Sequence, residues 1–236
     1  MSASVEELEA ATLAVPAPSP QLAAELAAAD ERLDGRHPLE VLSWAVGRFG
    51  HDLVLASSFQ DCVLVDLVMR VDRRVAVLFI DTGFHFAETL AYLRRIERRY
   101  GIEVTVVSAG LPPEQSPCGT ANCCQLRKVA PLNAFLAGRP AWVSGLKRVD
   151  TPERRQAPVV GWDAARGLVK VNPLAGWSEE DVEDYVVARD LPPHPLNSVG
   201  YLSIGCEPAT EPVAEGDDPR AGRWAGTAKT ECGLHL

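Results

Sequence analysis

The chain has 236 residues, of which 47% are hydrophobic and 23% are charged. These values are ordinary for a globular protein and exclude a mainly disordered or a collagen-like chain. The formal net charge of −9 argues against general nucleic-acid binding, which depends on neutralising phosphates with basic residues. No apolar run approaches the roughly 18 residues of a membrane helix, so we expect neither a nucleic-acid nor a membrane partner.

The N-terminal segment gives a prediction of compartment. Residues 1–29 are acidic and rich in Ala and Pro, and they lack the basic start and apolar stretch of a secretory signal. We therefore expect a cytoplasmic protein. In a reducing cytoplasm the six cysteines are expected to be ligands, nucleophiles or buried thiols rather than disulfides. Pro16 and Pro18 among alanines predict that residues 1–18 form a mobile tail.

The first half of the chain alternates between strand and helix patterns. Ser19 followed by Pro20 predicts a helix start, and the helical spacing of apolar residues continues to Phe49, before Gly50. The segments that follow are predicted in chain order as a strand over 53–56, a buried helix over 62–70, a strand over 75–80, an amphipathic helix over 86–100 and a strand over 102–107. Such alternation requires right-handed crossovers, so the predicted fold class is α/β: an open parallel sheet with helices on both faces.

The second half has weaker patterns. It is predicted in chain order as a loop over 108–122, a helix over 123–136, strands over 141–145 and 168–171, a helix from Ser178 with Asp181 in the capping-box position, and loops with a tail from Leu191 onward.

Two predicted strands end in small polar loops, Ser57–Asp61 and Asp81–Gly83. Ligands of open parallel sheets bind beyond the carboxyl ends of the strands, and the first loop leads into a helix N-terminus, which favours an anion. One such loop alone is usually a plain helix cap, whereas two on neighbouring strands indicate a nucleotide or phosphate site. The sequence contains neither G-x-x-x-x-G-K-[ST] nor G-x-G-x-x-G, so Walker and dinucleotide-binding interpretations lack support.

Basic residues gather in two places on this acidic chain. Residues 127–155 hold seven bases and two acids, and residues 220–229 hold three bases and no acid. Most charge runs are solvated faces, but a local basic surface is also what an anionic small substrate requires.

The cysteines fall into candidate ligands and a candidate nucleophile. Cys123 and Cys124 are adjacent at a predicted helix start. Neighbouring helical residues diverge by about 100°, so both thiols can serve one centre only at the helix end, and a multinuclear cluster suits this better than a single ion. Cys206 is a third candidate ligand. Cys232, on a tail of small residues near His235, is a candidate mobile nucleophile.

The remaining two cysteines have simpler interpretations. A buried core thiol accounts for Cys62, and an inert loop thiol accounts for Cys118.

Together these motifs resemble those of the assimilatory sulfonucleotide reductases, the adenylyl-sulfate and phosphoadenylyl-sulfate reductases. The matching segments are 57–61 as a modified pyrophosphate loop, 81–83 as a second nucleotide loop, 123–128 as the paired-cysteine motif of the iron–sulfur branch, 145–150 as a basic loop, and 220–224 and 231–235 as C-terminal signatures. The resemblance runs from about residue 40 to the end of the chain. The paired cysteines with the terminal Glu-Cys-Gly-Leu-His are the most specific combination.

The resemblance implies an adenine-nucleotide alpha-hydrolase-like fold and the reduction of adenylyl sulfate to sulfite and AMP in sulfate assimilation. Cys232 would attack the sulfate sulfur and carry an S-sulfonate, with His235 orienting the tail or lowering the Cys232 pKa, and a thioredoxin-type dithiol would release sulfite. The implied ligands of the phosphosulfate are Lys128, Arg148, Arg220 and Arg223, and the remaining substrate-binding candidates are Ser57, Ser58, Asp61 and Asp81.

The resemblance also implies a [4Fe–4S] cluster on Cys123, Cys124 and Cys206. The iron–sulfur branch carries Cys-x-x-Cys at the last of these positions, but here Ala209 stands where the fourth cysteine is expected. Such a cluster normally takes four thiolates. Three outcomes stay open: Cys118 fills the vacancy, one iron takes another ligand, or the cluster is lost.

Three other functions share some of these sequence features. Phosphoadenylyl sulfate, which carries an extra 3′-phosphate, is the nearest alternative substrate. An ATP-pyrophosphatase-type ligase needs a Ser-Gly-Gly-x-Asp-Ser loop that residues 57–61 do not supply. A non-catalytic iron–sulfur redox module needs neither the Cys232 tail nor the paired arginines. The predicted organisation is a mobile tail over 1–18, a nucleotide-binding reductase domain over 19–205 and a C-terminal tail over 206–236, and a homo-oligomer is left open.

Overall fold

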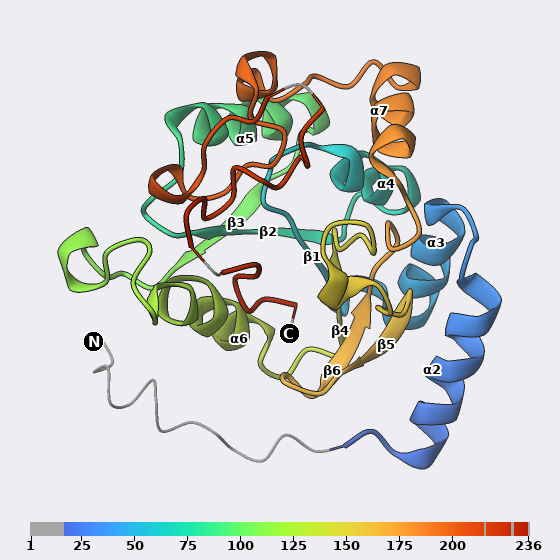
Figure 1. Ribbon diagram of the computed structural model, residues 1–236. Helices are drawn as coiled ribbons and strands as arrows, with labels where there is room; N and C mark the ends of the chain where they lie inside the picture. Colours follow the sequence, from blue (N-terminus) through green and yellow to red (C-terminus); the bar gives the residue numbers. More distant parts are fainter. Residues whose placement is uncertain (1–16, 215, 228, 236) are drawn as a thin grey trace.

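The computed structural model describes residues 17–214, 216–227 and 229–235 (Figure 1). Residues 1–16 of the expected mobile tail lie outside the described residues. The helices are α2 (Pro20–Leu33), α3 (Pro38–Phe49), α4 (Val63–Val71), α5 (Ala87–Tyr100), α6 (Ala130–Leu136) and α7 (Glu179–Ala188), and the strands are β1 (Leu53–Ala56), β2 (Ala76–Asp81), β3 (Val104–Ser108), β4 (Ala141–Ser144), β5 (Val160–Asp163) and β6 (Leu168–Val171).

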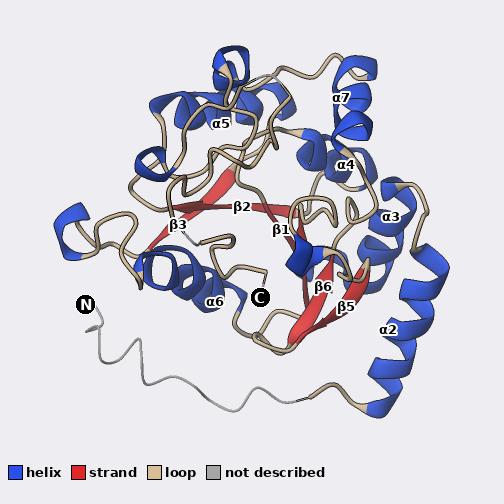
Figure 2. Ribbon diagram, viewed as in Figure 1, coloured by secondary structure: helices blue, strands red, loops and turns tan. Residues whose placement is uncertain are grey.

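The strands form one six-stranded sheet in the order β3-β2-β1-β4-β6-β5 (Figure 2). The register is parallel from β3 to β6, so the α/β fold class predicted from the sequence is confirmed. β5 pairs antiparallel with β6 at the edge of the sheet. The sequence analysis missed β5, because a four-residue edge strand that contains Gly161 and a half-buried Trp162 has no clear apolar pattern.

Helices cover both faces of the sheet. The larger core joins α2, α3, α4, α5 and α7 to inward side chains such as Leu55 and Phe79. The opposite face carries a smaller core in which Val54, Leu78 and Trp142 pack against α6, and Leu234 of the C-terminal segment joins it. The end of the chain therefore packs on the sheet beside α6.

The first predicted helix is in fact two. α2 begins after Ser19, whose Oγ accepts a hydrogen bond from the Leu22 N–H at 3.2 Å. It ends at Leu33, and α3 starts afresh at Pro38. A continuous helix through this point is wrong because proline lacks the N–H that the helical ladder needs.

The helix predicted over 123–136 also differs in detail. Residues 125–129 form a π-helical turn directly after the cysteine pair, and regular α-helix begins at Ala130. Such π-turns are rare and often lie at functional sites. Among the described residues, no helix is long and apolar enough to cross a membrane.

Candidate active site

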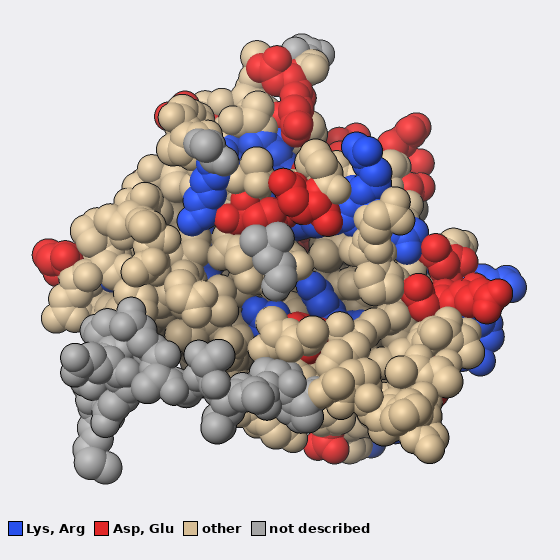
Figure 3. Space-filling model, turned by 60° about the horizontal axis from the view of Figure 1, so that its bottom comes forward, with Lys and Arg blue, Asp and Glu red and all other residues tan. Residues whose placement is uncertain are grey.

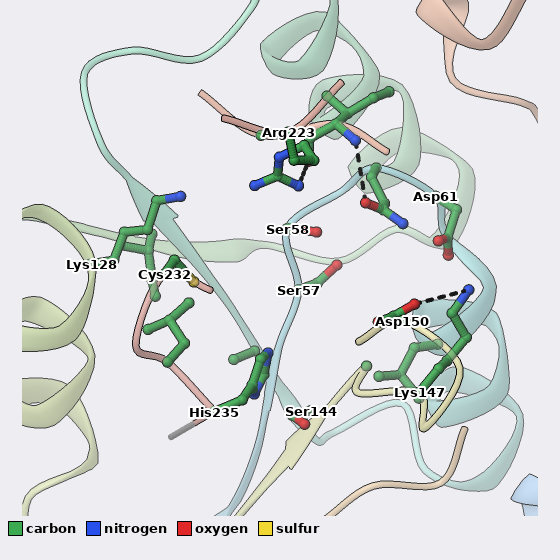
Figure 4. A pocket seen from close by; sticks show the side chains of 18 of the residues that line it. Ser57, Ser58, Asp61, Lys128, Ser144, Lys147, Asp150, Arg223, Cys232 and His235 are labelled. Carbon is green, nitrogen blue, oxygen red and sulfur yellow. Dashed lines mark hydrogen bonds and ion pairs between the residues drawn. The ribbon is translucent and has the colours of Figure 1, made fainter. Parts of the chain in front are cut away.

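A pocket of about 1370 Å³, partly open to solvent, lies beyond the carboxyl ends of β1, β2 and β4. β1 lies inside the sheet. The strands that follow it in the chain first extend the sheet on one side, as β2 and β3, and then on the other side, as β4 and β6. Ligands of open α/β sheets bind at such a switch point. The loop after β1, the loop after β4 and the C-terminal segment contribute side chains to the pocket (Figure 4).

The loop after β1 turns sharply at a buried aromatic residue. Phe59 has a φ of 55°, in the left-handed region that bulky residues rarely occupy. Its side chain is fully buried and meets the Phe79 ring edge-on at 5.8 Å. The Ser57 Oγ accepts the Phe59 N–H at 3.2 Å. Burial of Phe59 thus holds a strained turn that directs Ser57 and Ser58 to the pocket.

The two predicted nucleotide loops are used differently. Asp61 lines the pocket and also caps α4, because its Oδ1 accepts the Val63 N–H at 2.9 Å. Burial raises the pKa of the Asp61 carboxyl. Asp81 instead accepts the N–H of Gly83 at 2.8 Å and is not among the pocket-lining residues, whereas Thr82 of the same turn is.

Lys128 from the π-helical turn and Arg220 and Arg223 from the C-terminal segment are three of the cations that line the pocket. Among the described residues, none of these three cations forms an ion pair with a carboxylate. Burial opposes the charge on Lys128, but the negative charges of the Cys206 and Cys232 thiolates outweigh it and raise the pKa of Lys128. Lys and Arg side chains are visible in a hollow of the face drawn in Figure 3.

Arg223 is the most constrained of these cations. Its Nη1 donates to the Ser203 Oγ at 3.2 Å and to the Ile204 carbonyl at 3.3 Å, and its guanidinium lies 4.7 Å from the centre of the Trp224 ring. Its Nε is buried without a hydrogen-bond partner among the described residues. Burial, followed by the charge of Arg220, lowers the pKa of Arg223. A pocket-lining cation therefore keeps a buried donor without an acceptor among the described residues, which favours an anionic ligand.

Of the two cations in the basic loop after β4, one lies outside the pocket. Arg148 donates to the Asp34 carboxylate and to the Ala157 carbonyl, both at 2.8 Å, and is not among the pocket-lining residues. Lys147, which the sequence analysis did not select, lines the pocket and pairs with Glu179 at 2.5 Å. Neighbouring residues of an extended loop point in opposite directions, so the motif alone did not indicate which cation faces inward.

The two catalytic candidates both line the pocket (Figure 4). His235 stacks on the Trp142 ring at 6.3 Å, and the Lys170 ammonium donates to its Nδ1 at 3.2 Å. Burial and the neighbouring Lys170 hold the pKa of His235 well below its usual range, so the ring is neutral near pH 7. The described contacts of His235 thus join it to Lys170 and Trp142.

A buried ion pair tethers the segment that carries Cys232. Arg154 donates from Nε to Glu231 Oε1 at 2.5 Å and from Nη2 to Oε2 at 2.7 Å. Thr151 also donates to Glu231 at 3.0 Å, and Asp150 accepts from Arg154 at 2.6 Å. The sequence analysis missed this pair, although Arg154 lies in the basic stretch and Glu231 directly precedes Cys232. Partners 77 residues apart leave no local signal.

The candidate cluster cysteines lie outside the pocket and are all buried: Cys123, Cys124 and Cys206. The Cys118 thiol lies against the thiols of Cys206 and Cys123. The Cys118 thiol, and then the Lys128 charge, lower the pKa of the Cys206 thiol. Three of these cysteines lie within residues 118–124, and only Cys206 is distant from them in the sequence.

The donor atoms of the cysteine group are sulfurs alone. Among the described residues, no three Cys, His, Asp or Glu side chains surround a point that would hold a single metal ion. In a [4Fe–4S] cluster each thiolate binds a different iron, so the sulfurs surround a volume and not a point. Gathered thiols without carboxylates are the donor set that iron–sulfur clusters use.

Comparisons with known proteins agree with this architecture. Residues 52–212 match the family described as the phosphoadenosine phosphosulfate reductase domain. An adenosine 5'-phosphosulfate reductase of Mycolicibacterium smegmatis is 44% identical over 210 residues, which cover 84% of this chain and 87% of that protein. One of Mycobacterium tuberculosis is 43% identical over 242 residues, which cover 92% and 95%.

Solved structures show the same fold at low identity. The phosphoadenylyl-sulfate reductase of Candida auris, in a phosphate complex, superposes with a TM-score of 0.67 at 24% identity, over 84% of this chain and 99% of that chain. The FMN adenylyltransferase of Candida glabrata with FMN and an ATP analogue gives 0.59 at 17% identity, over 87% and 70%. From the family match and the extent of the relatives' identity, we conclude that the chain belongs to the sulfonucleotide reductase family, a family of oxidoreductases that act on sulfur.

Proposed function

We propose that this protein reduces adenosine 5'-phosphosulfate to sulfite and AMP, with Cys232 as the nucleophile, in sulfate assimilation. The observation that carries the proposal is the placement of Cys232 in one pocket with Lys128, Arg220 and Arg223. A thiol that reacts with a dianionic substrate needs cations to offset the charge of the attacking thiolate. The relatives named adenosine 5'-phosphosulfate reductase support the choice of substrate.

The chemistry proceeds in two transfers. The Cys232 thiolate attacks the sulfate sulfur, the bond between that sulfur and the bridging oxygen breaks, and AMP leaves with the electron pair. Cys232 then carries an S-sulfonate. A thiolate of a thioredoxin-type dithiol attacks the Cys232 sulfur and expels sulfite, and its second thiol resolves the mixed disulfide, so that the dithiol is oxidised and Cys232 is regenerated.

The cations are assigned to the phosphosulfate end of the substrate. The guanidinium of Arg223 has an unused Nε–H, and Arg220 and Lys128 flank the same space. Arginine can donate to two oxyanion oxygens at once, which suits adjacent phosphate and sulfate groups. The loop that contains Ser57, Ser58 and Asp61 is assigned to the nucleoside end.

His235 is assigned as a hydrogen-bond donor and not as a general base. The Lys170 ammonium can only donate, so at a separation of 3.2 Å it requires an unprotonated Nδ1. The neutral ring therefore carries its proton on Nε2. A fixed Nε2–H can donate to an oxygen of the leaving phosphate, and the Trp142 ring beneath it holds the imidazole plane.

A [4Fe–4S] cluster would be held by Cys123, Cys124 and Cys206. When bound, such a cluster adds negative charge close to Lys128, which helps to keep that lysine protonated beside the substrate. The chain's own thiols already act on Lys128 in this direction.

Steady-state assays with both nucleotides test the proposed function. We expect thioredoxin-dependent sulfite release from adenosine 5'-phosphosulfate, with a higher kcat/KM than for the 3′-phosphorylated nucleotide. Cys232→Ser should release no sulfite and still bind AMP. Cys62→Ala is the matched control, because Cys62 is a buried thiol outside the pocket, and it should retain activity. Preference for the 3′-phosphorylated nucleotide would refute the proposed substrate.

A further inference from the structure

The position that follows Cys206 by three residues cannot bind iron. Ala209 ends a short 3₁₀ turn over Glu207–Ala209 and has no donor atom in its side chain. Cys123, Cys124 and Cys206 therefore offer three thiols where a [4Fe–4S] cluster uses four.

A fourth thiol already lies in this group. Cys118 is half-buried in the loop between β3 and the π-helical turn. Its thiol lies against the thiols of Cys206 and Cys123. Of the remaining cysteines of the chain, Cys118 is thus the one that lies against two of the three candidates, since Cys62 lies in the main hydrophobic core and Cys232 lines the pocket.

The loop that carries Cys118 is held in place by a buried arginine. Arg127 donates to four carbonyl oxygens: those of Pro112 at 2.7 Å, Ser116 at 2.8 Å, Leu111 at 2.9 Å and Thr82 at 3.1 Å. Its side chain is almost completely buried and covers the Phe84 ring at 4.8 Å. Because Arg127 follows the cysteine pair by one turn, it fixes the loop before Cys118 against the segment that carries Cys123 and Cys124.

Cys206 is fixed to the same place from the other side. The Cys206 backbone bridges to His85, and the neighbouring Glu207 N–H donates to the Phe84 carbonyl at 2.7 Å. The Cys206 Sγ lies 3.5 Å from the Thr82 Oγ1. The loop after β2 therefore contacts both Arg127 and Cys206. Two independent sets of contacts bring Cys118 and Cys206 together.

Cys124 completes the group on the side of the C-terminal segment. The Lys229 ammonium donates to its Sγ at 3.1 Å. Lys229 also lies 5.6 Å from the centre of the Trp224 ring, beside Arg223 of the pocket. Lys229 therefore connects Cys124 to Trp224, which lines the pocket together with Arg223.

We propose that Cys118 supplies the fourth thiolate of an iron–sulfur cluster whose other ligands are Cys123, Cys124 and Cys206. This inference rests on the proposed function in that it assumes a cluster-bearing reductase. Cys118 thus takes the role that a cysteine at position 209 would have, and it comes from a different segment of the fold.

Iron loading without any turnover tests the proposal. Wild-type protein is reconstituted anaerobically with iron and sulfide, and its iron content and visible spectrum are compared with those of four variants. We expect Cys118→Ser to lose iron and visible absorption as fully as Cys124→Ser. Cys62→Ser should load like wild type. The double variant Cys118→Ser/Ala209→Cys should regain iron, because it returns a thiol to the position after Cys206.

Alkylation of the unmutated protein gives a second measurement that does not depend on variants folding. In iron-free protein a thiol reagent should label Cys118, and after loading Cys118 should be protected while Cys232 stays reactive. Equal labelling of Cys118 with and without iron, or full iron in Cys118→Ser, would overturn the proposal. Wild-type protein that takes up no iron would also overturn it, and S-sulfonation of Cys232 in that same sample would show that the proposed function survives.

Discussion

Arg223 combines burial, charge and an unsatisfied donor in one side chain. Its Nε–H has no acceptor among the described residues, and a buried donor left in this state costs about 1–3 kcal/mol. Trp224 lies against its guanidinium, and Arg223 lines the pocket. Arg148 offers the contrast, because it is a cation of the same sequence stretch that already has a carboxylate partner in Asp34.

Arg223→Ala should weaken the binding of adenosine 5'-phosphosulfate by about 1.5–3 kcal/mol, the range for a hydrogen bond to a charged group. This corresponds to a rise in Kd of about 10- to 150-fold. Calorimetry in a Cys232→Ser background measures binding without turnover. Arg148→Ala is the control and should leave Kd unchanged. Equal Kd values for Arg223→Ala and its parent would exclude Arg223 from the site.

The C-terminal segment is an element without regular secondary structure, and its position depends on a few strong contacts. Glu231 is tied by Arg154 and Thr151 to the loop after β4, and Leu234 packs against the core beside α6. Burial opposes ionisation of Glu231, but Arg154 outweighs it and lowers the pKa of this carboxyl. The tether is therefore complete above the ordinary pKa of Glu and is lost as pH falls through the lowered value.

Glu231→Gln should loosen this segment, because a neutral amide cannot satisfy both Arg154 nitrogens as an acceptor. We expect faster hydrogen exchange over residues 229–235 and, in single-turnover experiments, S-sulfonation of Cys232 slowed about tenfold or more, since the pair lost is a charged one. Glu180→Gln, at an exposed site on α7, is the control. Unchanged exchange in Glu231→Gln would mean that other contacts position the segment.

Elements with strong periodicity were predictable from the sequence, and those held by distant contacts were not. β1, β6 and the capped start of α7 lie where the apolar runs and the Ser178 capping box predict them. The break between α2 and α3 required weighing Pro38 above the continuing apolar spacing. In the site, the sequence selected Lys128, Arg220 and Arg223, which line the pocket.

The same motifs could not distinguish inward from outward side chains. Asp81 and Arg148 belong to matched loops, but Asp81 accepts from nearby Gly83 and Arg148 pairs with distant Asp34, both outside the pocket. Lys147, Arg154 and Glu231 reach the pocket because of how strand ends and the C-terminal segment meet in space. Orientation of this kind is set by tertiary packing, which leaves no periodic signal in the sequence.

At the scale of the whole molecule, the buried, neutral His194 joins the C-terminal part of the chain to α5. The His194 Nε2 lies 3.1 Å from Thr89 Oγ1 on α5, and its Nδ1 accepts the Leu196 N–H at 3.2 Å. Tyr92 covers the ring at 5.1 Å. Burial lowers the pKa of His194 to about 4, so the folded protein binds this proton far less readily than the unfolded chain does.

Stability should therefore fall as pH drops from about 6.5 towards 4, because the unfolded state binds more protons in that window. For His194 alone the expected loss between pH 7 and pH 5 is about 2 kcal/mol. Urea unfolding at the two pH values measures it. His194→Gln should be less stable at pH 7 but should lose about 2 kcal/mol less on acidification, whereas exposed His51→Gln should follow wild type. Parallel pH dependences for all three proteins would contradict the role of His194.

The arrangement of the whole molecule brings the loop after β1, the π-helical turn and the end of the chain to one pocket at the switch point of the sheet. The proposed reaction depends on one covalent event, the transfer of the sulfonate group to Cys232. Mass spectrometry of enzyme mixed with adenosine 5'-phosphosulfate in the absence of dithiol tests that event directly. We predict one added SO₃ group on the peptide that contains Cys232, with an equal amount of AMP released, and no adduct in Cys232→Ser. Turnover to sulfite without an adduct on Cys232, or an adduct on a different cysteine, would contradict the account.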